Sequence, residues 1–265
     1  MAGSALLTGA NGSAGLHAAG HLLKTYPELT TILTVRSTAS NDVNTNNLRQ
    51  ITTDGFDKTF QVNVIATVAV VLRLLDSFSP DGGRINLISS VAHYRRKNSL
   101  SPYVADIPAN LDELGTGVLR YGNSKLVLTT WTYALNKYLE QDPKYRYITA
   151  VEQNPGDFQD LRAFQNNTPW ILAFLAKYVM TPLNFLLQRL VDPTWRKCSE
   201  AGVDMVELAV NPKYNNGERG HYTLLKRDQP DEIVRDDQAQ ERVWRQVAEW
   251  AGIGQGECRL EGLLV

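Results

Sequence analysis

The chain has 265 residues, of which 43% are hydrophobic and 21% are charged, and its formal net charge at pH 7 is −1. This length suffices for one α/β domain with its own core, the composition is that of a soluble globular protein, and the near-zero charge gives no reason to expect a nucleic acid or an anionic membrane as partner. The two cysteines, Cys198 and Cys258, lie in no CxxC motif and beside no histidine cluster, which argues against a metal site and favours a reduced, cytoplasmic protein.

The first 35 residues have the pattern of a βαβ unit. An apolar run at residues 4–7 predicts a buried strand, and apolar residues at helical spacing over 16–23 predict an amphipathic helix. Residues 30–35 are rich in β-branched side chains and predict a second strand. The opening therefore implies a parallel sheet. No basic segment followed by a long apolar stretch begins the chain, so we expect no signal peptide.

The rest of the chain continues the alternation of helices and strands. Residues 36–54 are crowded with Ser, Thr, Asn and Asp and predict a loop. The elements expected after it are a helix at 56–75, a strand at 84–90, a helix at 121–139, strands at 147–151 and 221–225, and a helix at 237–250. The order predicts an α/β, Rossmann-like, doubly wound parallel sheet in a single domain over residues 1–265.

The most apolar segment is 170–191. Lys177, Pro182 and Arg189 interrupt it, so it is not expected to span a membrane. We expect a core helix or a lid over a substrate there. The alternative is a helix that rests on a membrane surface as a peripheral contact.

The segment TGANGSAG joins the first strand to the first helix. Glycine lets the backbone turn tightly and approach a pyrophosphate, whose charge is favoured by the free N–H groups of a helix N-terminus. The alternative is a tight strand–helix turn without a ligand. The candidate phosphate-binding residues are Thr8, Gly9, Asn11, Gly12, Ser13 and Gly15.

Tyr121 and Lys125 stand four residues apart in the long predicted helix, so both side chains project from one face. A free tyrosine has a pKa near 10, and a fixed ammonium beside it favours the phenolate. The pair is thus a candidate general acid or base. Taken alone, a surface tyrosine and lysine would explain the spacing equally well.

These motifs together resemble the short-chain dehydrogenase/reductase family, in its retinol-dehydrogenase-like, fungal-type branch. The family's TGxxxGxG turn is matched at Thr8, Gly9 and Gly15, with Ser13 in place of the middle glycine. Its YxxxK motif is matched at Tyr121. The family's serine motif is similar to NLISSV, where Ser90 is the match and Ser89 its alternative. Its asparagine helix is similar to FQVNV with Asn63, and its PG turn to Pro155 and Gly156.

The resemblance implies a role for each catalytic residue. Tyr121 would exchange a proton with the alcohol or carbonyl oxygen, and Ser90 would hydrogen-bond that oxygen. Lys125 would hold the nicotinamide ribose and favour the tyrosine phenolate, and Asn63 would fix a backbone kink and a water. Asn63, Tyr121 and Lys125 would also contact the cofactor. His93 is expected to be an ordinary surface histidine.

The cofactor implied is NADP(H). Arg36 follows the second strand where an NAD-binding chain has an acidic residue, and an arginine suits a 2′-phosphate, so NAD(H) is less favoured. An exposed arginine at a strand end is the alternative. An extended loop at 92–120 and a lid region at 157–215 imply a small lipophilic carbonyl or alcohol as substrate. A surface loop without a substrate role is equally consistent with the first of these segments.

The elements predicted from this sequence lack two strands that members of the family have. Members of the family place them, with a helix, before the asparagine helix, so about 50 residues are expected to be absent around the shortened region 36–54. The fourth strand normally pairs with the first and fifth. The leading hypothesis is an NADP(H)-dependent oxidoreductase. The alternatives are a truncated, non-catalytic relative that acts through interactions, and a splice or gene-model variant. Family dimers imply a homodimer packed through helices 56–75 and 121–139.

Overall fold

The computed structural model describes residues 3–35, 51–94, 117–158, 193–214 and 217–253, with the single residues 107, 189 and 260. The chain divides into two compact units, which are described separately below. Unit 1 comprises Met1–Asn46 and Pro155–Tyr214, and unit 2 comprises Asn47–Asn154 and Asn215–Val265. The sequence-predicted Arg36 and most of the segments 36–54, 92–120 and 157–215 lie outside the described residues.

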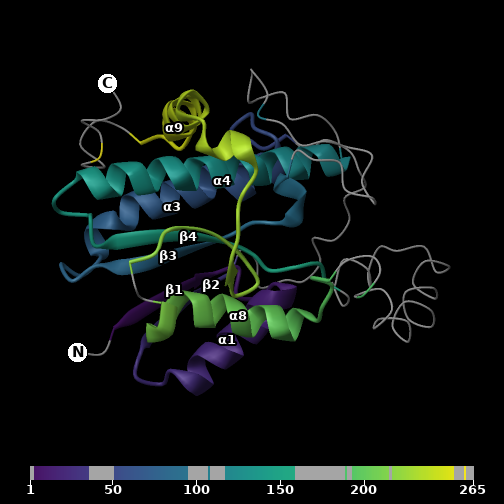
Figure 1. The fold of residues 1–265 in the computed structure, drawn as a ribbon, viewed down its shortest axis with the longest axis vertical. Coiled ribbons are helices and arrows are strands. Elements are labelled where there is room, and N and C mark those ends of the chain that lie inside the picture. Colours follow the sequence, from purple (N-terminus) through teal and green to yellow (C-terminus); the bar gives the residue numbers. More distant parts are fainter. Residues whose placement is uncertain are drawn as a thin grey trace. The chain divides into compact units, whose positions relative to one another are not determined.

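Unit 1 is a parallel strand pair with two helices (Figure 1). Its elements are β1 (Ser4–Thr8), α1 (Ser13–Thr25), β2 (Thr30–Thr34) and α8 (Cys198–Val210). The strands pair in register from Ser4 with Thr30 to Thr8 with Thr34. Ala5 and Leu7 of β1 pack with Leu22 of α1 and Val206 of α8 in a small core. The β-branched run and the helical spacing thus form the βαβ unit that the sequence predicts.

The helices α1 and α8 of unit 1 approach closely because small residues line their contact. A Cβ on Gly202 would lie 2.6 Å from the carbonyl oxygen of Ala14 and 2.7 Å from the nitrogen of Ala18. Ala14, Ala18 and Ala201 are buried beside it. Glycine at position 202 is therefore required by the packing of the two backbones.

Unit 2 contains a four-stranded sheet in the order β3-β4-β5-β6. The first three strands are parallel, and β6 pairs antiparallel with β5. The strands are β3 (Gly83–Ile88), β4 (Ile148–Asn154), β5 (Gly220–Thr223) and β6 (Lys226–Arg227), and the main helices are α3 (Ala66–Leu74), α4 (Gly117–Gln141) and α9 (Asp237–Trp250). Short helical turns complete the unit: α2 (Lys58–Phe60), η1 (Gln61–Ile65), η2 (Leu75–Ser77), η3 (Val91–His93) and η6 (Glu232–Arg235); η5 (Pro212–Tyr214) belongs to unit 1.

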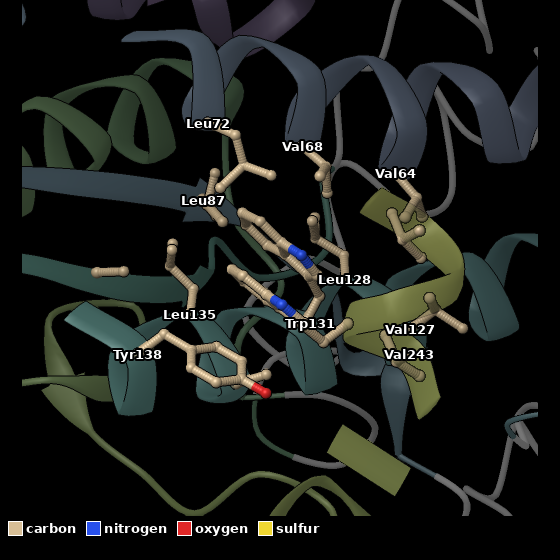
Figure 2. Packing of buried hydrophobic residues seen from close by; sticks show 14 of the residues in the cluster. Val64, Val68, Leu72, Leu87, Val127, Leu128, Trp131, Leu135, Tyr138 and Val243 are labelled. Carbon is tan, nitrogen blue, oxygen red and sulfur yellow. The ribbon is translucent and has the colours of Figure 1, made fainter. Parts of the chain in front are cut away.

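The core of unit 2 lies between the sheet and the helices α3 and α4, and between these two helices and α9 (Figure 1). Figure 2 shows Val68 and Leu72 of α3 directed toward Leu87 of β3 and Trp131 of α4. The rings of Trp131 and Trp244 are stacked 5.7 Å apart with an interplanar angle of 9°. This apolar packing fixes α4 against the sheet, and α4 carries two of the predicted catalytic residues.

The helix predicted at 56–75 forms in pieces. Asp57 accepts hydrogen bonds from the backbone of Thr59 and Phe60 and begins α2. The next five residues form the π-helix η1, in which the nitrogen of Ala66 donates to the carbonyl of Gln61. π-Helical turns carry one extra residue and occur frequently at functional sites. Asn63 lies inside this turn, which agrees with the backbone kink that the family resemblance implies.

The stretch Lys58–Ser77 is the one helix among the described residues that is long and apolar enough to cross a membrane, with a mean hydropathy of 1.5. The same test is passed by core helices. Phe60, Val64, Val68 and Leu72 along this stretch are buried in the core of unit 2. No clear transmembrane span follows.

Two strands of a full family sheet have no counterpart among the described residues. β1 pairs with β2 alone, and β3 pairs with β4 alone, so the strands that would flank the gap belong to separate sheets. The sheet therefore has fewer strands than a complete doubly wound sheet. Because residues 36–50 lie outside the described part, the internal deletion and the single domain over 1–265 stay predictions.

The packing of Gly202 can be tested with a matched pair of glycine substitutions. Gly202→Ala should destabilise the protein by about 1–3 kcal/mol, because its methyl group meets backbone atoms of α1. Gly20→Ala is the control, since Gly20 is also helical but a Cβ there would have no neighbour within 4 Å, and it should stabilise by up to about 1 kcal/mol. Urea unfolding measures both. Equal stability of the two variants would contradict the packing described.

Candidate functional site

The turn between β1 and α1 depends on glycine at two positions. Gly9 has φ +69°, in the left-handed region that favours glycine. A Cβ on Gly15 would lie 2.2 Å from the carbonyl oxygen of Gly9, so the helix could not begin so close to the turn with any larger residue. The nitrogen of Ala10 donates to the carbonyl of Thr34 at 3.0 Å, which ties the turn to β2.

The same turn presents the N-terminus of α1. Its N-cap is Gly12, no side chain caps it, and no acidic residue stands in its first turn. A helix N-terminus attracts an anion through its N–H groups and its dipole. The tight turn that Gly9 and Gly15 allow and this uncapped helix end fit a pyrophosphate group. The six sequence-predicted phosphate residues lie at the end of β1, in the turn and in the first turn of α1: Thr8, Gly9, Asn11, Gly12, Ser13 and Gly15.

The predicted PG turn follows β4 and belongs to unit 1. Gly156 has φ +82°, and Pro155 is buried. Arg196 clamps the turn: its Nε donates to the carbonyl of Pro155 at 2.7 Å, and its backbone nitrogen donates to the carbonyl of Asp157 at 2.8 Å. Its Nη1 lies 2.5 Å from Oδ2 of Asp204. A buried arginine paired in this way fixes the path of the chain after β4.

Unit 2 holds the proton-transfer residues on α4. Lys125 is 9% exposed, and its Nζ donates to the carbonyl of Ile88 at the end of β3, at 2.7 Å. The same Nζ lies 5.7 Å from the ring centroid of Tyr121, which is 39% exposed. The spacing of four residues thus places an accessible phenol above a buried ammonium.

Burial lowers the pKa of Lys125 to about 8, although the charge of Glu152 acts in the opposite direction. The lysine is therefore close to losing its charge near neutral pH. The charge of Glu152 opposes this loss and favours the ammonium.

Asn63 and Ser90 approach the same part of α4. The Nδ2 of Asn63 donates to Oγ of Ser124 at 2.9 Å, and that hydroxyl donates to the carbonyl of Tyr121 at 2.7 Å. Ser90 follows β3 as the N-cap of η3, where its Oγ accepts from the nitrogen of Ala92 at 3.3 Å. The four predicted catalytic residues are therefore gathered within unit 2 around the first half of α4.

The chain is similar to known dehydrogenases over different parts of its length. A family described as the AcuH dehydrogenase domain matches residues 161–260. The dehydrogenase acuH of Aspergillus aculeatus is 39% identical over 87 residues, which are 33% of this chain and 87% of that protein. The short-chain dehydrogenase iccH of Talaromyces variabilis is 26% identical over 199 residues, 60% of this chain and 53% of that protein. The chain belongs to the short-chain dehydrogenase/reductase family.

Two solved structures share the fold of this short-chain dehydrogenase/reductase. One is an uncharacterized protein from Mycobacterium paratuberculosis, with a TM-score of 0.60 and 16% identity over 95% of this chain and 94% of that chain. The other is a short-chain dehydrogenase/reductase from Serratia marcescens, with a TM-score of 0.52 and 16% identity over 84% of this chain and 96% of that chain. The predicted α/β, Rossmann-like fold is confirmed, and the chain is an oxidoreductase of this family. It spans about half the length of iccH, 53%.

The sequence did not predict a buried cluster of polar side chains near the catalytic residues. The prediction for His93, which belongs to this cluster, was wrong. His93 is not a surface residue: it is fully buried, and its Nδ1 donates to the carbonyl of Ser90 at 2.7 Å. Its ring centroid lies 4.8 Å from that of His221, whose Nδ1 lies 2.7 Å from Oε2 of Glu152. A glutamate directly after the predicted strand 147–151 was the signal available in the sequence, but its partner is 69 residues away.

The buried lysine predicts how stability depends on pH. Because folding lowers the pKa of Lys125 from 10.5 to about 8, the unfolded chain holds more protons between these values, and this group's contribution to stability rises as the pH increases through them. The rise is on the order of 3 kcal/mol.

The measurement is the difference in unfolding free energy between the wild-type chain and Lys125→Met, by urea denaturation at pH 7.5 and pH 10.5. The difference should shift in favour of the wild type at the higher pH. Taking the difference cancels the titration of other groups. A difference that is the same at both pH values would contradict the burial of a titrating lysine.

Proposed function

We propose that the chain is an NADP(H)-dependent oxidoreductase that interconverts a carbonyl and an alcohol on a small lipophilic substrate. The observation that carries the proposal is the placement of an accessible Tyr121 above the buried ammonium of Lys125, with Ser90 at the end of the adjoining strand. An exposed phenol beside a fixed cation is suited to proton transfer at neutral pH.

Each residue has a distinct part in the proposed chemistry. Tyr121 delivers a proton to the carbonyl oxygen during reduction and removes one from the hydroxyl during oxidation. Ser90 donates a hydrogen bond to that oxygen as charge develops on it. Lys125 favours the phenolate and holds the ribose hydroxyls of the cofactor. Asn63, through its bond to Ser124, anchors the π-helical turn beside Tyr121 and a water in the proton path.

The cofactor residues are assigned in the same way. The glycine turn of unit 1 holds the pyrophosphate, and Pro155 and Gly156 line the nicotinamide. Arg36 receives the 2′-phosphate, which favours NADP(H) over NAD(H). The bound cofactor supplies or accepts the hydride, and the protein orients and polarises the substrate.

The apolar character of the substrate is carried over from the resemblance to the retinol-dehydrogenase-like branch. The loop 92–120 and the lid 157–215 that would form an apolar pocket lie largely outside the described residues. The cytoplasmic location, the peripheral membrane contact and the homodimer remain predictions of the sequence.

One observation favours the second candidate, a non-catalytic truncated relative. Among the described residues, the strands β1 and β3 have no common neighbour, although a complete sheet has a central strand that pairs with both. Such a chain would keep the catalytic residues of its family but would bind no cofactor. It would act by interacting with other molecules. A splice or gene-model variant is expected to behave identically in a binding experiment.

A thermal-shift experiment separates the two candidates. NADPH at about 100 times its dissociation constant should raise the melting temperature by on the order of 5 °C. Gly15→Val should abolish this rise, because its Cβ would lie 2.2 Å from the carbonyl oxygen of Gly9 and so distort the turn that holds the pyrophosphate in the proposal. Arg36→Ala should weaken NADPH by about 10- to 100-fold and leave NADH unchanged, because it removes one charged hydrogen bond.

Circular dichroism of the free variants controls for folding. The absence of any NADPH-dependent shift in the wild-type chain would overturn the oxidoreductase proposal and favour the non-catalytic relative. A preference for NADH in the wild type would overturn only the assignment of Arg36.

A further inference from the structure

A buried cluster in unit 2 is not used by the proposed chemistry. Glu152 and His221 are 0% and 1% exposed, on the neighbouring strands β4 and β5. The Nδ1 of His221 lies 2.7 Å from Oε2 of Glu152, and Thr129 of α4 donates its hydroxyl to the other carboxylate oxygen. An isolated pair of ionisable side chains in a core is costly unless it is well hydrogen-bonded. The cluster therefore needs an explanation.

The carboxylate of Glu152 has the donors that an ionised group requires. Burial alone would raise its pKa, but the hydrogen bond and charge of His221, the charge of His93 and the hydroxyl of Ser89 lower the pKa below its ordinary value. An ionised carboxylate only accepts, so His221 donates through Nδ1. Thr129 carries one hydroxyl proton, and a carboxylate is a stronger acceptor than the carbonyl of Lys125 that also lies within reach.

The cluster lies directly behind Lys125. Thr129 is four residues after Lys125 and on the same face of α4, about 6 Å along the helix. Ser89, which lies 3.3 Å from the hydroxyl of Thr129, follows Ile88, whose carbonyl accepts from Nζ of Lys125. Glu152 is thus bonded to a residue one helical turn after Lys125, and its charge acts on an ammonium that is buried from water.

We infer that Glu152, held by His221 and Thr129, is the buried counter-charge that keeps Lys125 protonated at neutral pH, and so a positioning residue of the proton-transfer site. The inference rests on the proposed function for its relevance to catalysis. It agrees with the two opposed effects on Lys125, in which burial favours the neutral amine and the charge of Glu152 favours the ammonium.

The other groups around Lys125 do not supply this charge. The phenol of Tyr121 lies on the same helix, and β3 contributes a backbone carbonyl. Asp57, at the start of α2, is paired with Arg120 at 3.2 Å. His93, from η3, adds no negative charge.

The same cluster also reaches the catalytic serine. The backbone nitrogen and Nδ1 of His93 both donate to the carbonyl of Ser90, at 3.0 and 2.7 Å. The ring of His93 packs against that of His221. Glu152 therefore connects, through two imidazoles on one side and Thr129 on the other, to the segments that carry Ser90 and Lys125.

The test is a direct titration of Lys125 in the full chain, without cofactor or substrate. Lysine labelled with carbon-13 at Cε reports its own protonation by NMR, and the resonance of Lys125 is the one missing from Lys125→Met. The wild-type midpoint should lie near pH 8. Glu152→Gln should lower that midpoint by about one pH unit or more, because it removes the negative charge that favours the ammonium of Lys125.

A matched control is Glu241→Gln. Glu241 on α9 is also a hydrogen-bonded carboxylate, but it accepts from Tyr138, which is 13 residues after Lys125 and so about 20 Å along α4. This variant should leave the Lys125 midpoint unchanged. A Glu152→Gln midpoint equal to the wild-type value would overturn the inference, and so would an equal decrease in the control.

If Glu152→Gln shows no cooperative unfolding, the double variant Glu152→Leu/His221→Phe replaces it, because apolar substitution of a whole buried pair is often tolerated. The same decrease in midpoint is expected, and its absence would equally overturn the inference. Because the measurement needs no cofactor, a chain that fails to bind NADPH but shows the decrease would refute the proposed function and not this role of Glu152.

Discussion

The candidate site depends on one buried cation. The ammonium of Lys125 is removed from water by the packing of α4 on the sheet, and it donates to the carbonyl of Ile88 at the end of β3. This bond joins the helix that carries Tyr121 to the strand that leads into Ser90. The same burial disfavours the charged form of Lys125, and the negative charge of Glu152 favours it. The relative positions of the catalytic residues and their protonation thus follow from one side chain.

A second constraint is the division of the sheet. Unit 2 has its own core, in which the indoles of Trp131 and Trp244 are stacked, and the described residues of this core all belong to unit 2. The proton-transfer residues can therefore assemble even though β1 and β3 belong to separate sheets. The glycine turn assembles independently in unit 1, since its geometry depends on contacts among Gly9, Gly15 and β2. Each of the two local arrangements is thus formed by contacts within its own unit.

The structural features that could be predicted from the sequence are those determined by residues close together along the chain. The strand–turn–helix of unit 1, the four-residue spacing of Tyr121 and Lys125, and the helix Asp237–Trp250 all rest on periodicity or turn chemistry, and each forms as expected. The π-helical turn at Asn63 has no period of its own to detect. The pairing of Glu152 with His221 joins strands far apart in sequence, and the burial of His93 follows from that pairing. Such contacts are determined by tertiary packing, which periodicity does not encode.

The most direct test of the account is whether this chain transfers a hydride. NADPH deuterated at C4 of the nicotinamide, incubated with decanal or benzaldehyde, should give an alcohol that carries deuterium at the former carbonyl carbon, as measured by mass spectrometry. The account predicts deuterium in the product of the wild-type chain and a decrease of about 100-fold or more with Tyr121→Phe. Recovery of the aldehyde without conversion to alcohol by a chain saturated with NADPH would contradict hydride transfer. Equal deuterium transfer by the wild type and Tyr121→Phe would contradict the role of Tyr121.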